Sequence, residues 1–216
     1  MDPQRFDVVI AGAGLVGLAL APALARSGLS VVLVDRAPIA APDPDPSTWD
    51  ARVYAISPGS AAFLRAIGAW QRLPSERVTA VEAMRVTGDA GALLSFSAYD
   101  QGERALAWIV EERALRAALL PGVFEAGVEV IGGAPFVGLV WFADEAKLTL
   151  DTGGDGRRTL AARLVVEELE ARRRAGLADV RARRGGAAFR WDGPAGRSPD
   201  TVSADLPRAA GAAFSA

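Results

Sequence analysis

Residues 6–17 of this chain read FDVVIAGAGLVG, an apolar stretch that runs into the pattern Gly-x-Gly-x-x-Gly. Its first half is rich in β-branched residues, which predicts a strand buried on both faces. A helical stretch follows over residues 15–26, and a second apolar strand, SVVLVD, follows over 30–35. The order strand, glycine turn, helix and strand predicts a βαβ unit with parallel strands.

The residue types in this unit point to dinucleotide binding. Gly12 permits a tight turn, Gly14 lets the backbone approach a pyrophosphate, and Gly17 lets the helix pack closely on the strand. The helix N-terminus offers N–H groups to phosphates. Asp35, 18 positions after Gly17, is placed to accept the ribose hydroxyls of an adenosine, and Arg36 beside it is a further candidate for cofactor binding. These residues leave FAD and NAD open, and a βαβ unit that merely needs small residues at its turn is the alternative.

Composition restricts the chemistry that the side chains can perform. The 216 residues include no His and no Cys. Thiolate nucleophiles, iron–sulfur clusters, Cys-ligated zinc and Ser-His-Asp catalysis are therefore excluded. We expect no catalytic side chain and no metal site, so that demanding chemistry must come from a bound cofactor. The formal net charge of −2 argues against nucleic acid as a partner.

Residues 8–25 carry no charge, and a run of this length is also a candidate membrane span. The glycines within it and Pro22 favour instead a buried strand that turns into a buried helix. We therefore expect a cytoplasmic protein.

A second motif lies at residues 50–70, DARVYAISPGSAAFLRAIGAW, where Ser57 before Pro58 predicts a helix N-cap and the pattern that follows predicts a helix through Trp70. The pattern D-x-R-x-x-A-[IL]-S-x-x-S-x-x-x-L-x-x-x-G-x-W, after the glycine turn, resembles the UbiH/UbiF/VisC-type FAD-dependent hydroxylases of ubiquinone biosynthesis, which are single-component aromatic monooxygenases. Residues 107–120, AWIVEERALRAALL, are similar to the strand-to-helix segment of that family.

The resemblance implies FAD as cofactor and NAD(P)H as electron donor. It implies that the three glycines hold the FAD pyrophosphate and Asp35 the adenosine ribose. Arg52 would reach the FAD phosphates or the isoalloxazine side, and Arg113 the ribityl–phosphate region. The alternatives are a surface ion pair with Asp50 for Arg52, and a solvated charge at a helix start for Arg113.

The implied substrate is a small aromatic molecule, a polyprenylated phenol. The resemblance also implies association with the membrane surface or with a complex for ubiquinone biosynthesis.

The expected fold is α/β: a Rossmann-like FAD/NAD(P)-binding domain with a parallel sheet, a β-hairpin crossover and part of a second sheet. We expect residues 1–166 to form this domain, with the start of the substrate domain inserted at about 75–110. Within that insertion, residues 81–87 and 93–96 predict a strand and its return strand. Residues 136–140 and 147–152 predict the hairpin.

The composition changes after Val166. Of the 50 residues from 167 to 216, 31 are Ala, Gly, Arg or Pro, and only seven are Val, Ile, Leu, Met or Phe. Segments this poor in apolar residues rarely form a core. The G-A-D-G and G-D-A-A-H motifs of the resembled family are absent from this tail. We expect that a frameshift or truncation replaced the sequence after about Val166; an unusual natural C-terminus or an engineered one is the alternative. We expect one helix over 167–183 and coil beyond, and hence no hydroxylation by the chain as written. The alternative function is an inactive FAD-binding fragment.

Overall fold

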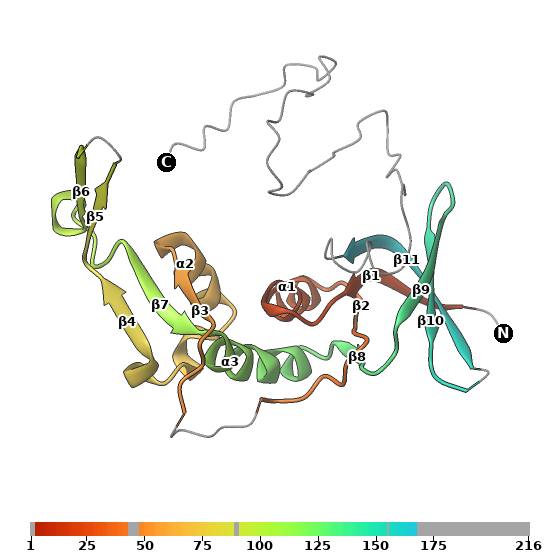
Figure 1. Ribbon diagram of the computed structural model, residues 1–216. Helices are drawn as coiled ribbons and strands as arrows, with labels where there is room; N and C mark the ends of the chain where they lie inside the picture. Colours follow the sequence, from red (N-terminus) through yellow and green to blue (C-terminus); the bar gives the residue numbers. More distant parts are fainter. Residues whose placement is uncertain (1–2, 43–47, 89–90, 155, 168–216) are drawn as a thin grey trace, which may run out of the picture. The chain divides into compact units, whose positions relative to one another are not determined.

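A computed structural model describes residues 3–42, 48–88, 91–154 and 156–167. Its largest sheet has six strands in the order β8-β2-β1-β11-β10-β9 (Figure 1). The first four of these are mutually parallel, and β10 and β9 continue the sheet antiparallel. The bounds are β1 Gln4–Ala11, β2 Val31–Val34, β8 Glu129–Ile131, β9 Phe136–Trp141, β10 Ala146–Asp151 and β11 Arg157–Glu167. The Rossmann-like parallel sheet expected from the sequence is confirmed.

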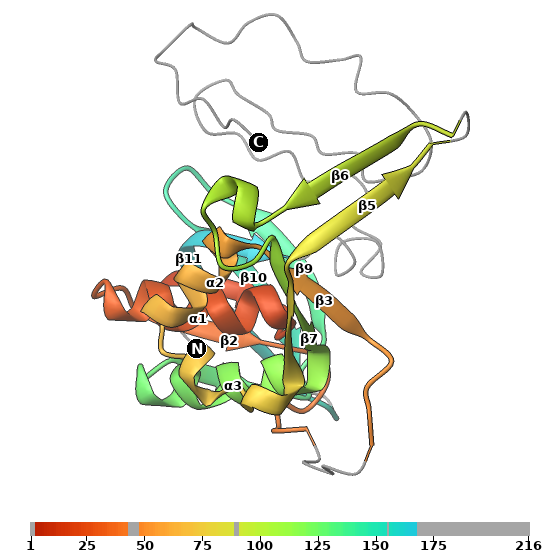
Figure 2. The same cartoon turned by 90° about the vertical axis from the view of Figure 1, so that its left-hand side faces the viewer.

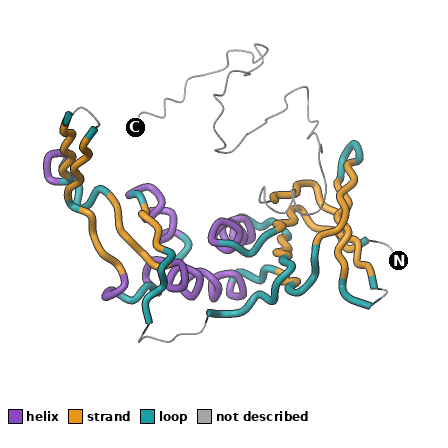
Figure 3. The backbone as a smooth tube through the Cα atoms, in the orientation of Figure 1, coloured by secondary structure: helices purple, strands orange, loops and turns teal. Residues whose placement is uncertain are grey.

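Two helices pack together beside this sheet (Figures 1 and 3). Helix α1, Leu15–Arg26, connects β1 to β2, and α3, Glu112–Glu125, leads to β8. Every residue of β2 is buried, as expected for a parallel strand covered on both faces. The shared core contains apolar residues of β1, β2, α1 and α3: Val8, Ile10, Leu18, Leu33, Leu115, Leu119 and Val123. The uncharged run at 8–25 is therefore a buried strand and a helix, as predicted.

A second, antiparallel sheet has the order β3-β7-β4, with bounds Val53–Ile56, Ala107–Glu111 and Val78–Val81. Helix α2, Pro58–Ala66, follows β3, and its N-terminus is capped by Ser57 with Pro58 in the first turn, as predicted. The helical pattern expected through Trp70 is wrong beyond Ala66. Gly68 adopts φ +77° and ends the helix, so Trp70 opens the short 3₁₀ helix η1, Trp70–Arg72.

Two hairpins complete the described residues. Strands β5, Ala83–Thr87, and β6, Leu93–Ser97, pair only with each other (Figure 2). Strands β9 and β10 form the predicted hairpin in the connection from β8 to β11. Two further 3₁₀ helices are η2, Ser75–Arg77, and η3, Tyr99–Gln101. Of the helix expected over 167–183, Glu167 instead ends strand β11, and the rest of that helix and the coil after it lie outside the described residues.

Candidate functional site

The glycine turn between β1 and α1 has a backbone that needs its small residues. Gly12 has φ +124°, a conformation that favours glycine. A Cβ on Gly17 would lie 2.0 Å from the carbonyl oxygen of Gly12 and 3.4 Å from Cγ2 of Ile10. The first turn of α1 therefore presses directly on the turn and on β1, which is the close packing expected of the third glycine.

The N-terminus of α1 differs from that of α2 in its capping. Ser57 accepts a hydrogen bond from the N–H of Ser60 and so caps α2. Gly14 stands at the equivalent place before α1, where no side chain caps the helix and no acidic residue occupies the first turn. The N–H groups of a first helical turn lack intrahelical partners and carry partial positive charge. This end of α1 is therefore suited to an anion.

Asp35 lies at the carboxyl end of β2, next to the glycine turn. Its Oδ2 accepts the N–H of Ala13 at 2.7 Å, and its Oδ1 accepts the N–H of Ala37 at 2.8 Å. The half-buried carboxylate thus ties the turn to the end of β2, while each oxygen keeps a second lone pair. Arg36 follows as an exposed side chain.

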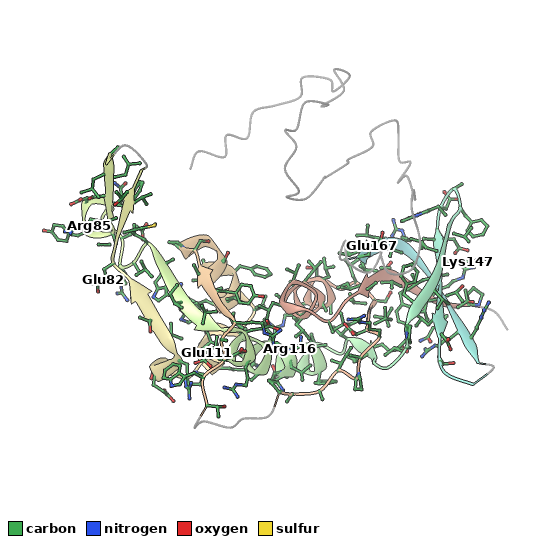
Figure 4. The ribbon with its side chains drawn as sticks, in the orientation of Figure 1. Glu82, Arg85, Glu111, Arg116, Lys147 and Glu167 are labelled. Carbon is green, nitrogen blue, oxygen red and sulfur yellow. The ribbon has the colours of Figure 1, made fainter. Side chains whose placement is uncertain are left out.

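A residue of the site that the sequence reasoning missed is Arg116. Its Nη1 donates to the carbonyl oxygen of Ala13 at 2.8 Å, from helix α3 into the glycine turn (Figure 4). The available signal was a charged residue set between the buried Leu115 and Ala118, three positions after Arg113. A partly buried guanidinium at this place increases the positive potential around the turn.

Residues 50–52 are fixed to the junction of β7 and α3 by hydrogen bonds. Asp50 donates its N–H to Glu111 Oε2 at 3.0 Å, and its carboxylate accepts the N–H groups of Arg52 and Arg113 at 3.0 and 3.1 Å. Glu112 donates its N–H to the carbonyl oxygen of Arg52 at 2.9 Å. These hydrogen bonds join the segments 50–70 and 107–120 that the resemblance singled out, although Asp50 and Arg113 are 63 positions apart.

Two of the three predicted arginines, Arg52 and Arg113, have their side chains in this region and not at the glycine turn. They belong to a second cluster of charged residues, which consists of Asp50, Arg52, Arg77, Glu111, Glu112 and Arg113. Arg52 is largely exposed, with Nη1 3.1 Å from Glu112 and Nε 3.8 Å from Asp50. Arg113 donates to the carbonyl and hydroxyl oxygens of Thr48 at 2.6 and 2.9 Å. The ion pair with Asp50 considered from the sequence is thus present. The structure brings together the glycines, Asp35 and Arg116 at the turn, whereas Arg52 and Arg113 lie at the start of α3.

Glu111 is the buried charge of this second cluster (Figure 4). Arg77 donates to its Oε1 at 2.8 Å, and the guanidinium of Arg77 also lies 4.2 Å from the centre of the Trp49 ring. Burial raises the pKa of Glu111, but the N–H of Asp50 and the charges of Arg77 and Arg113 outweigh it and hold the pKa below its ordinary value. The pKa of Asp50 is also lowered, first by the N–H of Arg52.

The described ranges, with their gaps at 43–47, 89–90 and 155, hold no group of three or more acidic side chains arranged to ligate a metal ion. Among the helices of those same ranges, none combines the length and the apolar character needed to cross a bilayer.

Comparison with known proteins shows which family this chain matches. A family model described as an FAD binding domain matches residues 5–181. The chain is 32% identical over 164 residues to the ubiquinone hydroxylase UbiL of Rhodospirillum rubrum, a match that covers 74% of this chain and 36% of UbiL. It is 31% identical over 119 residues to the 3-demethoxyubiquinol 3-hydroxylase of Escherichia coli, covering 55% of this chain and 30% of that enzyme.

A third relative is the ubiquinone biosynthesis monooxygenase COQ6 of Danio rerio, 34% identical over 123 residues, which are 55% of this chain and 25% of COQ6. The matches therefore span between a quarter and about a third of the length of these curated relatives.

Solved structures support the same fold. The anhydrotetracycline hydroxylase OxyS from Streptomyces rimosus matches with a TM-score of 0.59 at 24% identity, over 76% of this chain and 31% of OxyS. The p-nitrophenol 4-monooxygenase PnpA from Pseudomonas putida matches with a TM-score of 0.59 at 20% identity, over 77% of this chain and 41% of PnpA. At these identities the likeness concerns the arrangement of the chain.

Proposed function

We propose that this chain, which belongs to the FAD binding domain family, holds the adenosine diphosphate half of FAD at residues 12–17 and Asp35. The single observation that carries the proposal is the uncapped N-terminus of α1 behind a glycine turn that a Cβ would obstruct. Phosphate oxygens would accept the N–H groups of this first turn, and Asp35 would accept the ribose hydroxyls with its remaining lone pairs.

The arginines of the site are proposed to hold the rest of the cofactor. Arg116 lies within hydrogen-bond distance of the turn and would favour the pyrophosphate charge. Arg52 is largely exposed, and by exchanging its contact with Glu112 for the cofactor it would reach the FAD phosphates or the isoalloxazine side. Arg113 would approach the ribityl–phosphate region, and Arg36 the outer side of the adenosine. The cluster of Asp50 and Glu111 positions Arg52 and Arg113 through backbone hydrogen bonds.

For the whole protein we propose FAD-dependent hydroxylation of an aromatic ring, with NAD(P)H as electron donor and a polyprenylated phenol as substrate. The relatives named as ubiquinone hydroxylases support this activity. FAD, when bound, supplies the electron transfer and the oxygen chemistry. The protein binds and orients the cofactor, and we assign no catalytic side chain.

The proposed domain assignment is an FAD-binding domain at 1–166, in which about 75–110 begin the substrate domain. Location in the cytoplasm, with peripheral attachment to a membrane or to a complex for ubiquinone biosynthesis, belongs to the same proposal.

A second candidate function is FAD binding without catalysis. It concerns this chain by itself, whose match to UbiL covers 36% of the length of that enzyme. An assay with FAD, NAD(P)H and a polyprenylated phenol separates the two candidates when hydroxylated product and H₂O₂ are measured together. Product in proportion to NAD(P)H consumed supports the hydroxylase, whereas H₂O₂ without product supports the binding fragment.

The binding proposal is tested by calorimetric titration of ADP and FAD into the protein and its Gly14→Val variant. We expect the variant to lose measurable ADP binding, because the new side chain blocks the approach of the pyrophosphate while the fold is kept. The matched control is Gly59→Val in the first turn of α2, where nothing lies within 4 Å of the added Cβ. Equal ADP affinity of parent and Gly14→Val would remove the phosphate site from the glycine turn.

A further inference from the structure

A cavity of about 500 Å³ lies beside the second sheet, at the start of β7. It shares no lining residue with the proposed cofactor site, whose arginine cluster lies at the other end of β7. Residues of α2, η1, η2, the loop before β7 and β7 itself line it: Arg65, Trp70, Gln71, Ser75, Arg104 and Trp108. We propose that this cavity is a second ligand site, which binds an aromatic carboxylate.

The walls of the cavity suit a flat apolar body. The rings of Trp70 and Trp108 meet edge to face, with centroids 5.4 Å apart and planes at 77°. Both indoles are only half-buried, so part of each ring lies open to the cavity. Aromatic ligands pack on indoles in this geometry more favourably than their area alone accounts for. Leu73 and Val78 add aliphatic surface to the same walls.

The charges of the cavity suit an anion. The guanidinium of Arg65 lies 4.6 Å from the centre of the Trp70 ring and 5.5 Å from that of Trp108. Among the described residues, neither Arg65 nor Arg104 forms an ion pair, and no acceptor is bonded to either guanidinium. The fork of N–H donors on each remains available to the two oxygens of a carboxylate.

Two arginines close in sequence to the lining residues have carboxylate partners, unlike Arg65 and Arg104. Arg72 pairs with Glu125 at 2.6 Å, and Arg77 pairs with Glu111 at 2.8 Å. Glu76 and Glu103 adjoin lining residues in the sequence, but neither of them lines the cavity. The two unpaired cations therefore face a cavity with aromatic walls and no carboxylate among its lining residues, and Gln71 and Ser75 add polar groups at its rim.

The site is tested by ¹⁹F NMR of the whole chain labelled with 5-fluorotryptophan, without FAD, so that failure of the flavin proposal leaves the result unaffected. The chain has five tryptophans, and Phe variants assign the signals of Trp70 and Trp108. Naphthalene-2-carboxylate should shift these two signals saturably and leave that of Trp141, on β9, in place. Naphthalene-2-methanol, which lacks the charge, should bind at least about tenfold more weakly.

Arg104→Gln should weaken binding of naphthalene-2-carboxylate about threefold to tenfold, since one charged partner is lost. This exposed residue has no ion-pair partner among the described residues, so its replacement leaves the fold intact. Arg65→Gln should have a larger effect, and Arg85→Gln on β5 is the matched control with no effect. Equal affinity for the acid and the alcohol, uniform shifts of all tryptophans, tighter binding of 2-naphthyl phosphate, or parental affinity of Arg104→Gln would each overturn the proposal.

Discussion

Gly17 shows that the glycine turn leaves no room for a Cβ atom at this position. A Cβ at this position would lie 2.0 Å from the carbonyl oxygen of Gly12, far inside van der Waals contact, and the atom it meets is backbone. We expect Gly17→Ala to lower the free energy of unfolding by about 1–3 kcal/mol, because α1 must move away from β1. Urea denaturation followed by circular dichroism measures this change.

Gly59→Ala is the matched control for this substitution. Gly59 is also in the first turn of a helix, yet nothing lies within 4 Å of its added Cβ. The same change should there raise stability by about 0.5–1 kcal/mol, since alanine restricts the unfolded chain. If both variants unfolded at the same urea concentration, the close contact of α1 with the turn would be refuted.

At the scale of elements, α2 depends on its cap. Ser57 Oγ accepts the N–H of Ser60 at 3.2 Å and so satisfies one free donor of the helix start. Ser57→Ala should lower stability by about 1 kcal/mol in thermal or urea unfolding. Ser57→Asp, which restores an acceptor at the same place, should retain the parental stability. A Ser57→Asp variant as unstable as Ser57→Ala would show that the cap does not hold the helix.

The elements also show which features a sequence reveals. β1, the turn, α1 and β2 were predictable because their signals lie within 36 consecutive residues and follow local rules. The end of α2 was misplaced because Gly68 was counted into the helical pattern, whereas its positive φ stops the helix.

The site itself was predictable only in part. The glycines and Asp35 follow from spacing along the chain. Arg116 reaches Ala13 across 103 positions; its place among buried residues of α3 marks it as unusual, but no local pattern indicates its partner. The bonds of Asp50 to Glu111 and Arg113 were hidden for the same reason, since the pairing of β3 with β7 brings residue 50 to the start of α3.

For the whole molecule, the lowered pKa values of three carboxyl groups predict that the folded state loses stability in acid. The N–H of Ser30 lowers the pKa of Asp7, and the pKa values of Asp50 and Glu111 are lowered as described above. A carboxyl whose pKa is lower in the folded state stabilises that state when ionised. This stabilisation is complete above the pKa of the unfolded chain and is lost as pH falls through the folded pKa. Stability should therefore decline below about pH 5.

Glu111→Gln isolates the buried member of this set. We expect the variant to unfold at a lower urea concentration than the parent at pH 7, and the difference to shrink as pH falls below about 4. Glu82→Gln, at an exposed position between β4 and β5, is the control that should follow the parent at every pH. Parallel curves for the parent and Glu111→Gln would show that the ionised carboxylate of Glu111 does not stabilise the fold.

The position of β1 in the large sheet has a consequence for the newly made chain. β1 pairs with β2 on one side and with β11 on the other, and the register joins Gln4 to Leu160. A ribosome adding about 5–20 residues per second needs on the order of ten seconds to make this second partner. Throughout that interval the edge of β1 that will pair with β11 has unpaired N–H and C=O groups, which strands of other nascent chains can pair with. During synthesis the chain is therefore exposed to aggregation through β1, for a time set by the distance in sequence between β1 and β11.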